Sequence, residues 1–82
     1  MIEVYYTEDD EIIGKSVKEY LEQHNCKVTL CESIADTRKA LLNHLPAVVL
    51  LDWNMPDGHG SELCCWIRER WKALPIIYLT VR

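Results

Sequence analysis

Apolar residues along the chain gather in four short runs, separated by longer stretches in which apolar and polar residues are mixed. The runs cover residues 2–7, 27–31, 47–51 and 76–80. Short runs rich in β-branched and aromatic residues are typical of strands. The run 27–31 alternates apolar and polar residues, which favours an edge strand. The runs 47–51 and 76–80 are apolar throughout, which is typical of strands buried on both faces of a parallel sheet.

The mixed stretches between the runs have apolar residues at intervals of three and four positions, which predicts helices with one buried stripe. Helices are expected at 10–25, 33–45 and 61–71, and the first residues of the second form a capping-box-like start at Ser33. The segment 52–60, rich in Pro and Gly, is expected to be a loop. The side chains expected to face the core from these helices are Ile13, Val17, Tyr20, Leu21 and His24 in the first, Ile34, Thr37, Leu41 and Leu45 in the second, and Leu63, Cys64, Ile67 and Trp71 in the third.

Strands and helices therefore alternate along the chain with short connections. This order predicts an α/β fold, with a parallel sheet and right-handed crossovers. Sheets of this kind bind ligands beyond the carboxyl ends of their strands, at the point where the winding direction reverses.

Composition narrows the classes of partner. The 82 residues carry 13 acidic side chains against 9 Lys and Arg, for a net charge of −4, so this segment has no basic surface for nucleic acid. No apolar run approaches the roughly 20 residues that span a bilayer, and nothing at the amino end resembles an export signal. A cytoplasmic protein without a membrane partner is expected. The four cysteines form no C-x-x-C pair and are expected to be free thiols: Cys26, Cys31, Cys64 and Cys65.

Polar residues follow the predicted strands at one end of the sheet. Glu8, Asp9 and Asp10 follow the first strand, Asp52 directly follows the third, and Thr80 ends the fourth. Carboxylates that meet there repel one another unless a cation lies among them, and hard oxygen ligands suit Mg²⁺. The alternative for residues 8–10 is that these acids only begin a helix, where negative charge is favourable. That alternative does not account for Asp52.

Three segments resemble the receiver domain of two-component response regulators, which has the CheY-like (flavodoxin-like) fold. They are T-E-D-D-E after the first strand, L-L-D-W-N-M-P-D-G-H-G after the third, and I-I-Y-L-T-V-R at the fourth. The middle segment continues as S-E-L-C-C-W-I-R, which is most similar to receivers of OmpR-type winged-helix transcriptional regulators. The resemblance covers essentially the whole chain.

The resemblance implies a role for each matching residue. Asp52 matches the phosphoacceptor, which takes a phosphoryl group from a sensor histidine kinase. Glu8 and Asp9 match the acidic pair that binds Mg²⁺ together with Asp52 and the backbone carbonyl of Asn54. Thr80 matches the switch hydroxyl that turns toward the phosphoryl group. The implied protein is a signalling module that regulates transcription through an effector domain, not an enzyme.

The chain also departs from the family pattern. That pattern continues after the fourth strand with a helix, a strand that carries a lysine, and a last helix, whereas no lysine follows Thr80 here. Residues 1–82 are thus interpreted as the amino-terminal portion of a receiver. The fourth strand would then be an exposed apolar edge, which predicts self-association. Val81 stands where the family usually has a small residue, and it is expected to crowd access to Asp52.

Two alternatives remain open from the sequence. The chain can be a receiver that has lost phosphorylation and serves as an interaction module, as the missing lysine suggests. It can also be a Mg²⁺-dependent phosphatase with an aspartyl nucleophile. Such enzymes typically carry a second Asp two residues after the nucleophile, where this chain has Asn54, and this argues against the phosphatase. His59, beside Asp52, is interpreted as a solvated loop residue.

Overall fold

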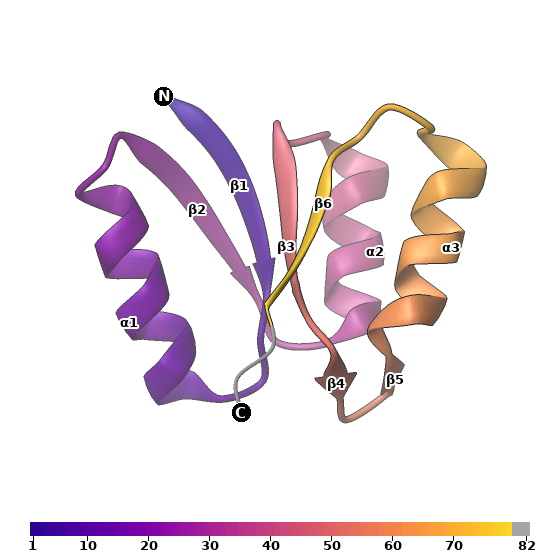
Figure 1. The fold of residues 1–82 in the computed structure, drawn as a ribbon, viewed down its shortest axis with the longest axis horizontal. Coiled ribbons are helices and arrows are strands. Elements are labelled where there is room, and N and C mark those ends of the chain that lie inside the picture. Colours follow the sequence, from indigo (N-terminus) through magenta and orange to yellow (C-terminus); the bar gives the residue numbers. More distant parts are fainter. Residues whose placement is uncertain (80–82) are drawn as a thin grey trace.

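The computed structural model describes residues 1–79, which form a parallel sheet with helices on both faces (Figure 1). The four strands of the sheet have the order β2-β1-β3-β6. The α/β class, with strands and helices in alternation, is as predicted. The elements are β1 Ile2–Thr7, α1 Glu11–Glu22, β2 Cys26–Cys31, α2 Ile34–Asn43, β3 Val48–Asp52, β4 Asn54–Met55, β5 Gly58–His59, α3 Gly60–Arg70 and β6 Ile76–Leu79.

The winding direction reverses at β1, because β2 lies on one side of it and β3 on the other. In the β1–β3 pair, Thr7 is opposite Leu51. The residues that follow these two, Glu8 and Asp52, therefore leave the sheet side by side. This register places them at the switch point, where parallel α/β sheets bind ligands.

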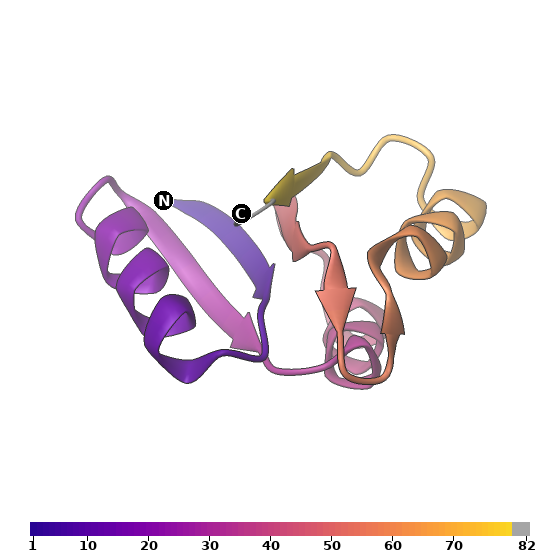
Figure 2. The same cartoon turned by 60° about the horizontal axis from the view of Figure 1, so that its bottom comes forward.

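The two faces of the sheet carry separate apolar cores. Helix α1 covers one face, and α2 and α3 cover the other (Figures 1 and 2). Val4 and Tyr6 point into the core beneath α1, whereas Tyr5 points into the core beneath α2 and α3. Successive side chains of β1 thus point alternately into the two cores, which explains why this strand is buried on both faces.

The helices begin and end close to the predicted positions, but three predicted core residues are exposed. Tyr20 is 61% exposed and packs its ring on His24, with the ring centroids 4.5 Å apart. His24 lies beyond the end of α1 and before Asn25, whose φ of 65° turns the chain toward β2. Leu45 is exposed because α2 ends at Asn43 and His44 already has an extended backbone. The predictions for His24 and Leu45 are therefore wrong because both residues lie beyond the ends of their helices. The prediction for Tyr20 is wrong because the buried face of α1 does not extend to this position.

The sheet edges agree with the alternating and apolar patterns only in part. The alternating strand β2 lies at an edge, as predicted. The apolar strand β6 is the other edge among residues 1–79, as predicted from the departure from the family pattern. Its Ile77 and Tyr78 are exposed, so the burial on both faces that its apolar run predicts is wrong. The predicted loop 52–60 contains a small antiparallel hairpin of β4 and β5, in which Asn54 pairs with His59. The four cysteines are free, as predicted, although Cys65 is exposed. Within residues 1–79, the helices are too short or too polar to cross a membrane.

Candidate functional site

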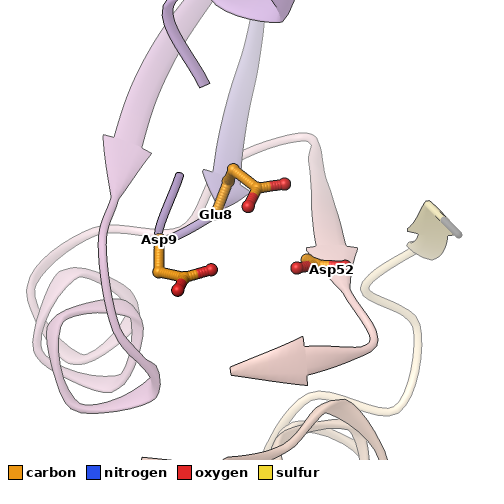
Figure 3. Close-up of side chains that lie close together, drawn as sticks. All are labelled: Glu8, Asp9 and Asp52. Atoms are coloured by element: carbon orange, nitrogen blue, oxygen red, sulfur yellow. The ribbon is translucent and has the colours of Figure 1, made fainter. Parts of the chain in front are cut away.

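Three carboxylates converge at the carboxyl end of the sheet (Figure 3). Oxygens of Glu8, Asp9 and Asp52 all lie within 4.8 Å of one another, in the one such cluster found among residues 1–79. Glu8 and Asp9 follow β1, and Asp52 is the last residue of β3. The structure thus brings together three of the acidic residues that the sequence singled out.

Asp10 serves a different purpose from its two neighbours. Its carboxylate accepts hydrogen bonds from the backbone N–H groups of Ile12 at 2.9 Å and Ile13 at 3.0 Å. Asp10 is therefore the N-cap of α1. The alternative considered for this acidic run, that its acids only begin a helix, holds for Asp10 and leaves Glu8 and Asp9 free to face Asp52.

Glu8 is the buried member of the cluster, with only 4% of its surface exposed. The hydroxyl of Tyr6 donates to one of its carboxylate oxygens at 3.2 Å, and the backbone N–H of Asp10 donates to the other at 3.1 Å. Burial raises the pKa of Glu8, and the negative charges of Asp52 and Asp9 raise it further, against the two hydrogen bonds, which lower it. Ionisation of Glu8 in this site therefore costs more free energy than it does in water, and a bound cation would lower that cost.

The phenol of Tyr6 is fixed as a hydrogen-bond donor. Burial raises the pKa of Tyr6 far above its usual value, and the charge of Glu8 adds to the effect. The hydroxyl therefore keeps its proton throughout the physiological range and donates it to Glu8. The sequence pattern predicts a strand at Tyr6 but no role for its hydroxyl, because a polar contact between residues two positions apart in sequence leaves no periodic signal.

The remaining two carboxylates are open to solvent. Asp9 is exposed and Asp52 is half-buried, so a water molecule or a phosphate oxygen can reach the cluster from outside. Hard carboxylate oxygens that leave room for water are the ligands that Mg²⁺ prefers. The donor set therefore fits this ion, with Glu8, Asp9 and Asp52 as the residues that would hold it.

The chain after Asp52 is held close to the start of α3. The N–H of Gly60 donates to the carbonyl of Trp53 at 2.8 Å. A Cβ atom on Gly60 would lie 3.1 Å from the carbonyl oxygen of Asp52 and 3.3 Å from that of Trp53. The absence of a side chain at Gly60 thus allows the helix to approach the backbone of Asp52. The ring of Trp53 packs edge-on against Tyr78, with centroids 4.9 Å apart.

The other predicted site residues lie in the hairpin after Asp52 or outside the described residues. The backbone of Asn54 lies in β4, two residues after Asp52. Thr80, the predicted switch residue, and Val81, predicted to crowd Asp52, lie outside the described residues. His59 is exposed in β5, as expected of a solvated loop residue, and its N–H donates to Glu62 at 3.0 Å.

Comparison with known proteins identifies the family. The model of the "Response regulator receiver domain" family matches residues 4–82. The transcriptional regulatory protein RstA of Escherichia coli K12 is 31% identical over 77 residues, which cover 94% of this chain and 32% of RstA. GltR of Pseudomonas aeruginosa is 34% identical over 79 residues, covering 94% of this chain and 33% of GltR. The chain thus spans about a third of the length of these curated relatives.

Solved structures agree with the sequence matches. The non-phosphorylated HemR receiver domain of Leptospira biflexa superposes with a TM-score of 0.93 at 32% identity, covering 100% of this chain and 66% of that one. The response regulator TrrA of Thermotoga maritima, solved in complex with Mg²⁺ and BeF, gives a TM-score of 0.95 at 27% identity, covering 100% of this chain and 71% of that one. The chain belongs to the response regulator receiver domain family, and it has that family's parallel α/β fold and its role as a module of two-component signalling.

Proposed function

We propose that the chain accepts a phosphoryl group on Asp52 from a sensor histidine kinase, in a reaction that needs Mg²⁺. The observation that carries this proposal is the cluster of Glu8, Asp9 and Asp52 within 4.8 Å at the carboxyl end of the sheet. The cluster does not favour the alternative, a receiver that has lost phosphorylation, because all three acids that phosphorylation would need are present.

The surroundings of the three acids support Asp52 as the nucleophile. Both carboxylate oxygens of Glu8 already accept hydrogen bonds, and this side chain is buried. Asp9 is exposed on a loop, whereas Asp52 ends the central strand β3 and is half-buried. A nucleophile must be both fixed in position and reachable, and Asp52 meets both needs. Glu8, Asp9 and the backbone carbonyl of Asn54 would hold the metal together with Asp52.

The chemistry needs little from the protein beyond position and charge. An ionised carboxylate oxygen of Asp52 attacks the phosphorus of the kinase phosphohistidine. The P–N bond breaks with its electron pair staying on nitrogen, and the histidine leaves as neutral imidazole because its other ring nitrogen carries a proton from solvent. The carboxylate needs no general base because it is already ionised. Bound Mg²⁺ would supply the screening that brings the negatively charged phosphoryl group close to three carboxylates. Thr80 is proposed as the hydroxyl that then donates to the phosphoryl group.

Phosphorylation would change the charge of the site and so act as a signal. A phosphoryl group adds about −1.5 to −2 units of charge at neutral pH, which biases the neighbouring surface between two states. RstA and GltR are named as transcriptional regulatory proteins. We therefore extend the proposal to a non-enzymatic, cytoplasmic regulator of transcription, in which residues 1–82 form the amino-terminal portion of the receiver and DNA binding belongs to an effector domain outside this chain. A second copy, pairing along the edge of β6, is a further proposed partner.

Incubation with acetyl phosphate and Mg²⁺, followed by intact-mass measurement, tests the proposal. The chain is expected to gain one phosphoryl group, and EDTA or Asp52→Ala is expected to abolish the gain. Asp36→Ala, which removes an exposed acid from the first turn of α2, is the matched control and is expected to gain the group normally. An adduct that persists in Asp52→Ala would contradict the assignment of the nucleophile. Steady release of phosphate from phosphate esters would instead indicate the phosphatase.

A further inference from the structure

The first turn of α2 is bonded to both segments that carry the acidic cluster. On one side it contacts the hairpin that follows Asp52, and on the other it contacts the last residue of β1, directly before Glu8. These contacts join parts of the chain that are more than 20 residues apart in sequence. They are outside the cluster itself.

The contact on the hairpin side is made by Asp57, in the turn between β4 and β5. Its two carboxylate oxygens accept hydrogen bonds from the backbone N–H groups of Ile34 at 3.0 Å and Ala35 at 3.1 Å. Asp57 is exposed, so packing does not account for its place. The N–H of Ile34 is the main cause that holds the pKa of Asp57 below its ordinary value, and the N–H of Ala35 adds to it. The carboxylate therefore remains ionised and bonded at neutral pH.

The contact on the β1 side is made by two buried hydroxyl groups. Thr37 donates to the carbonyl of Ser33 at 2.9 Å, within the first turn of α2. Its oxygen lies 2.8 Å from the hydroxyl of Thr7, and both side chains are fully buried. Because the proton of Thr37 is already directed to Ser33, Thr7 is the donor in this pair. The last residue of β1 is thus bonded to the same helical turn as Asp57.

Helix α2 does not depend on Asp57 alone for its start. Ser33 is the N-cap, and its hydroxyl accepts from the N–H of Asp36 at 3.0 Å. Asp57 instead satisfies the two preceding N–H groups, which Ser33 does not bond through its side chain. The helix would therefore retain a cap without Asp57, whereas the hairpin would lose its side-chain bonds to α2.

We propose that Asp57 is a positioning residue, which ties the hairpin after Asp52 to the first turn of α2 and thereby sets the position of the Asn54 carbonyl relative to Glu8 and Asp9. This inference rests on the proposed function, since it concerns the same site. Asn54, whose backbone carbonyl is also a proposed metal ligand, begins the hairpin three residues before Asp57. A hairpin released from α2 would move that carbonyl relative to Glu8 and Asp9, and the proposed ligands would no longer meet at one ion.

The test compares Asp57→Ala with Ser33→Ala by measuring the Mg²⁺ dissociation constant, the rate of phosphorylation by acetyl phosphate, and the midpoint of urea unfolding. Ser33→Ala removes a bond within α2 of the same kind and leaves Asp57 in place. Asp57→Ala is expected to weaken Mg²⁺ binding about tenfold, on the scale seen when residues that orient metal ligands are removed. Its rate at low Mg²⁺ should fall in proportion and recover at saturating Mg²⁺. Ser33→Ala is expected to lower the unfolding midpoint but leave the dissociation constant unchanged.

Asp57→Asn provides a graded third variant, because its amide oxygen accepts one of the two hydrogen bonds and its NH₂ group cannot accept the other. An intermediate dissociation constant is expected. A wild-type dissociation constant in folded Asp57→Ala would overturn the inference, and so would an equal weakening in Ser33→Ala. If the unsubstituted chain gains no phosphoryl group and binds no Mg²⁺, the proposed function fails and this inference fails with it. The behaviour of the unsubstituted chain thus distinguishes the two failures.

Discussion

The hydroxyl of Tyr6 donates a hydrogen bond of 3.2 Å to the carboxylate of Glu8, and both side chains are buried. Tyr6 lies in the apolar core beneath α1, so its polar end reaches the acidic cluster from inside the protein. The second oxygen of Glu8 accepts from the N–H of Asp10. Glu8 is therefore fixed by one hydrogen bond from the core and one from the start of α1. Its carboxylate lies beside those of Asp9 and Asp52.

Tyr6→Phe is expected to weaken Mg²⁺ binding at mildly acidic pH more than at neutral pH. The bond from Tyr6 lowers the pKa of Glu8, so its loss raises that pKa further and keeps the acid protonated to a higher pH. Titration of Mg²⁺ affinity against pH measures the effect. The free energy of unfolding should also fall by about 1 kcal/mol, the usual contribution of one hydrogen bond.

Tyr5→Phe is the matched control for this substitution. The hydroxyl of Tyr5 donates to the carbonyl of His44 at 2.6 Å, on the opposite face of β1. A similar loss of stability is expected, without a change in the pH dependence of Mg²⁺ binding. Equal pH profiles in all three proteins would contradict the role given to Tyr6.

Without metal, the free energy of unfolding is expected to fall as the pH rises above the ordinary pKa of a glutamate side chain. Burial raises the pKa of Glu8 in the folded state, so over the window between the unfolded and folded values the folded protein binds more protons than the unfolded chain. Stability due to Glu8 is then present below this window and is lost as the pH rises through it. Urea unfolding at several pH values, with EDTA or with excess Mg²⁺, measures this, and Mg²⁺ should stabilise the protein most at neutral pH.

Glu8→Gln isolates the contribution of this carboxylate. At neutral pH without Mg²⁺, removing the repulsion is expected to stabilise the protein by about 1 to 4 kcal/mol, the range for two like charges roughly 4 Å apart between bulk water and a protein surface. About 1 kcal/mol of this gain is offset, because the NH₂ group of Gln cannot accept one of the two hydrogen bonds that Glu8 accepts. Stabilisation by Mg²⁺ should be lost at the same time. Glu11→Gln, at an exposed acid in the first turn of α1, should do neither. A Glu8→Gln protein that is less stable than the unsubstituted one under these conditions would refute the account of a self-repelling site.

The sequence was sufficient to predict the acidic cluster, because each step rested on a regular pattern. Five apolar residues fix β3 as a central strand, Asp52 follows directly, and the carboxyl ends of parallel strands meet at one edge of the sheet. The bond from Asp57 to Ile34 and Ala35 follows no such pattern. It joins a turn to a helix 22 and 23 residues away in sequence, and either end could have been satisfied by water. The contact between Thr7 and Thr37 was equally hidden, although Thr37 was placed on the inward face of its helix.

The two buried threonines are expected to respond unequally to substitution. Thr7→Val leaves Thr37 donating to Ser33, whereas Thr37→Val leaves the buried hydroxyl of Thr7 without its partner. An unsatisfied buried polar group costs about 1 to 3 kcal/mol, so Thr37→Val should destabilise the protein by this amount and Thr7→Val by less. The double variant should be more stable than Thr37→Val alone. Urea unfolding of the four proteins forms the complete cycle, and additive losses would show that the hydroxyls do not interact.

Gly60→Ala and Gly14→Ala are expected to differ because of what each new methyl group would meet. At Gly60 it would lie 3.1 Å from the carbonyl oxygen of Asp52, a backbone atom that cannot move without displacing the proposed nucleophile. At Gly14, in α1, it would lie 3.0 Å from the end of the Leu30 side chain, which can change its rotamer. Gly60→Ala should lose about 1 to 3 kcal/mol of stability, the usual cost of overpacking, and should slow phosphorylation.

Gly14→Ala provides the control for the new methyl group itself. The gain of up to about 1 kcal/mol in helix propensity on replacing Gly by Ala is expected to offset the movement of Leu30, and phosphorylation should proceed at the normal rate. Urea unfolding and intact-mass time courses measure both quantities. A Gly60→Ala protein as stable and as readily phosphorylated as Gly14→Ala would show that the close approach of α3 to Asp52 has no consequence.

The exposed edge of β6 leads us to expect self-association. Among residues 1–79, this strand pairs with β3 on one side only, and Ile77 and Tyr78 are 50% and 37% exposed. An apolar edge strand is a template for pairing with a second copy, and lysine on such an edge opposes pairing. Light scattering across a concentration series should show a dimer whose dissociation constant rises about tenfold or more in Ile77→Lys, since this substitution puts a charged lysine on the pairing edge. Leu42→Lys, at an exposed leucine on α2, should leave the dimer unchanged. A monomer at every concentration, or equal weakening by both substitutions, would refute pairing through this edge.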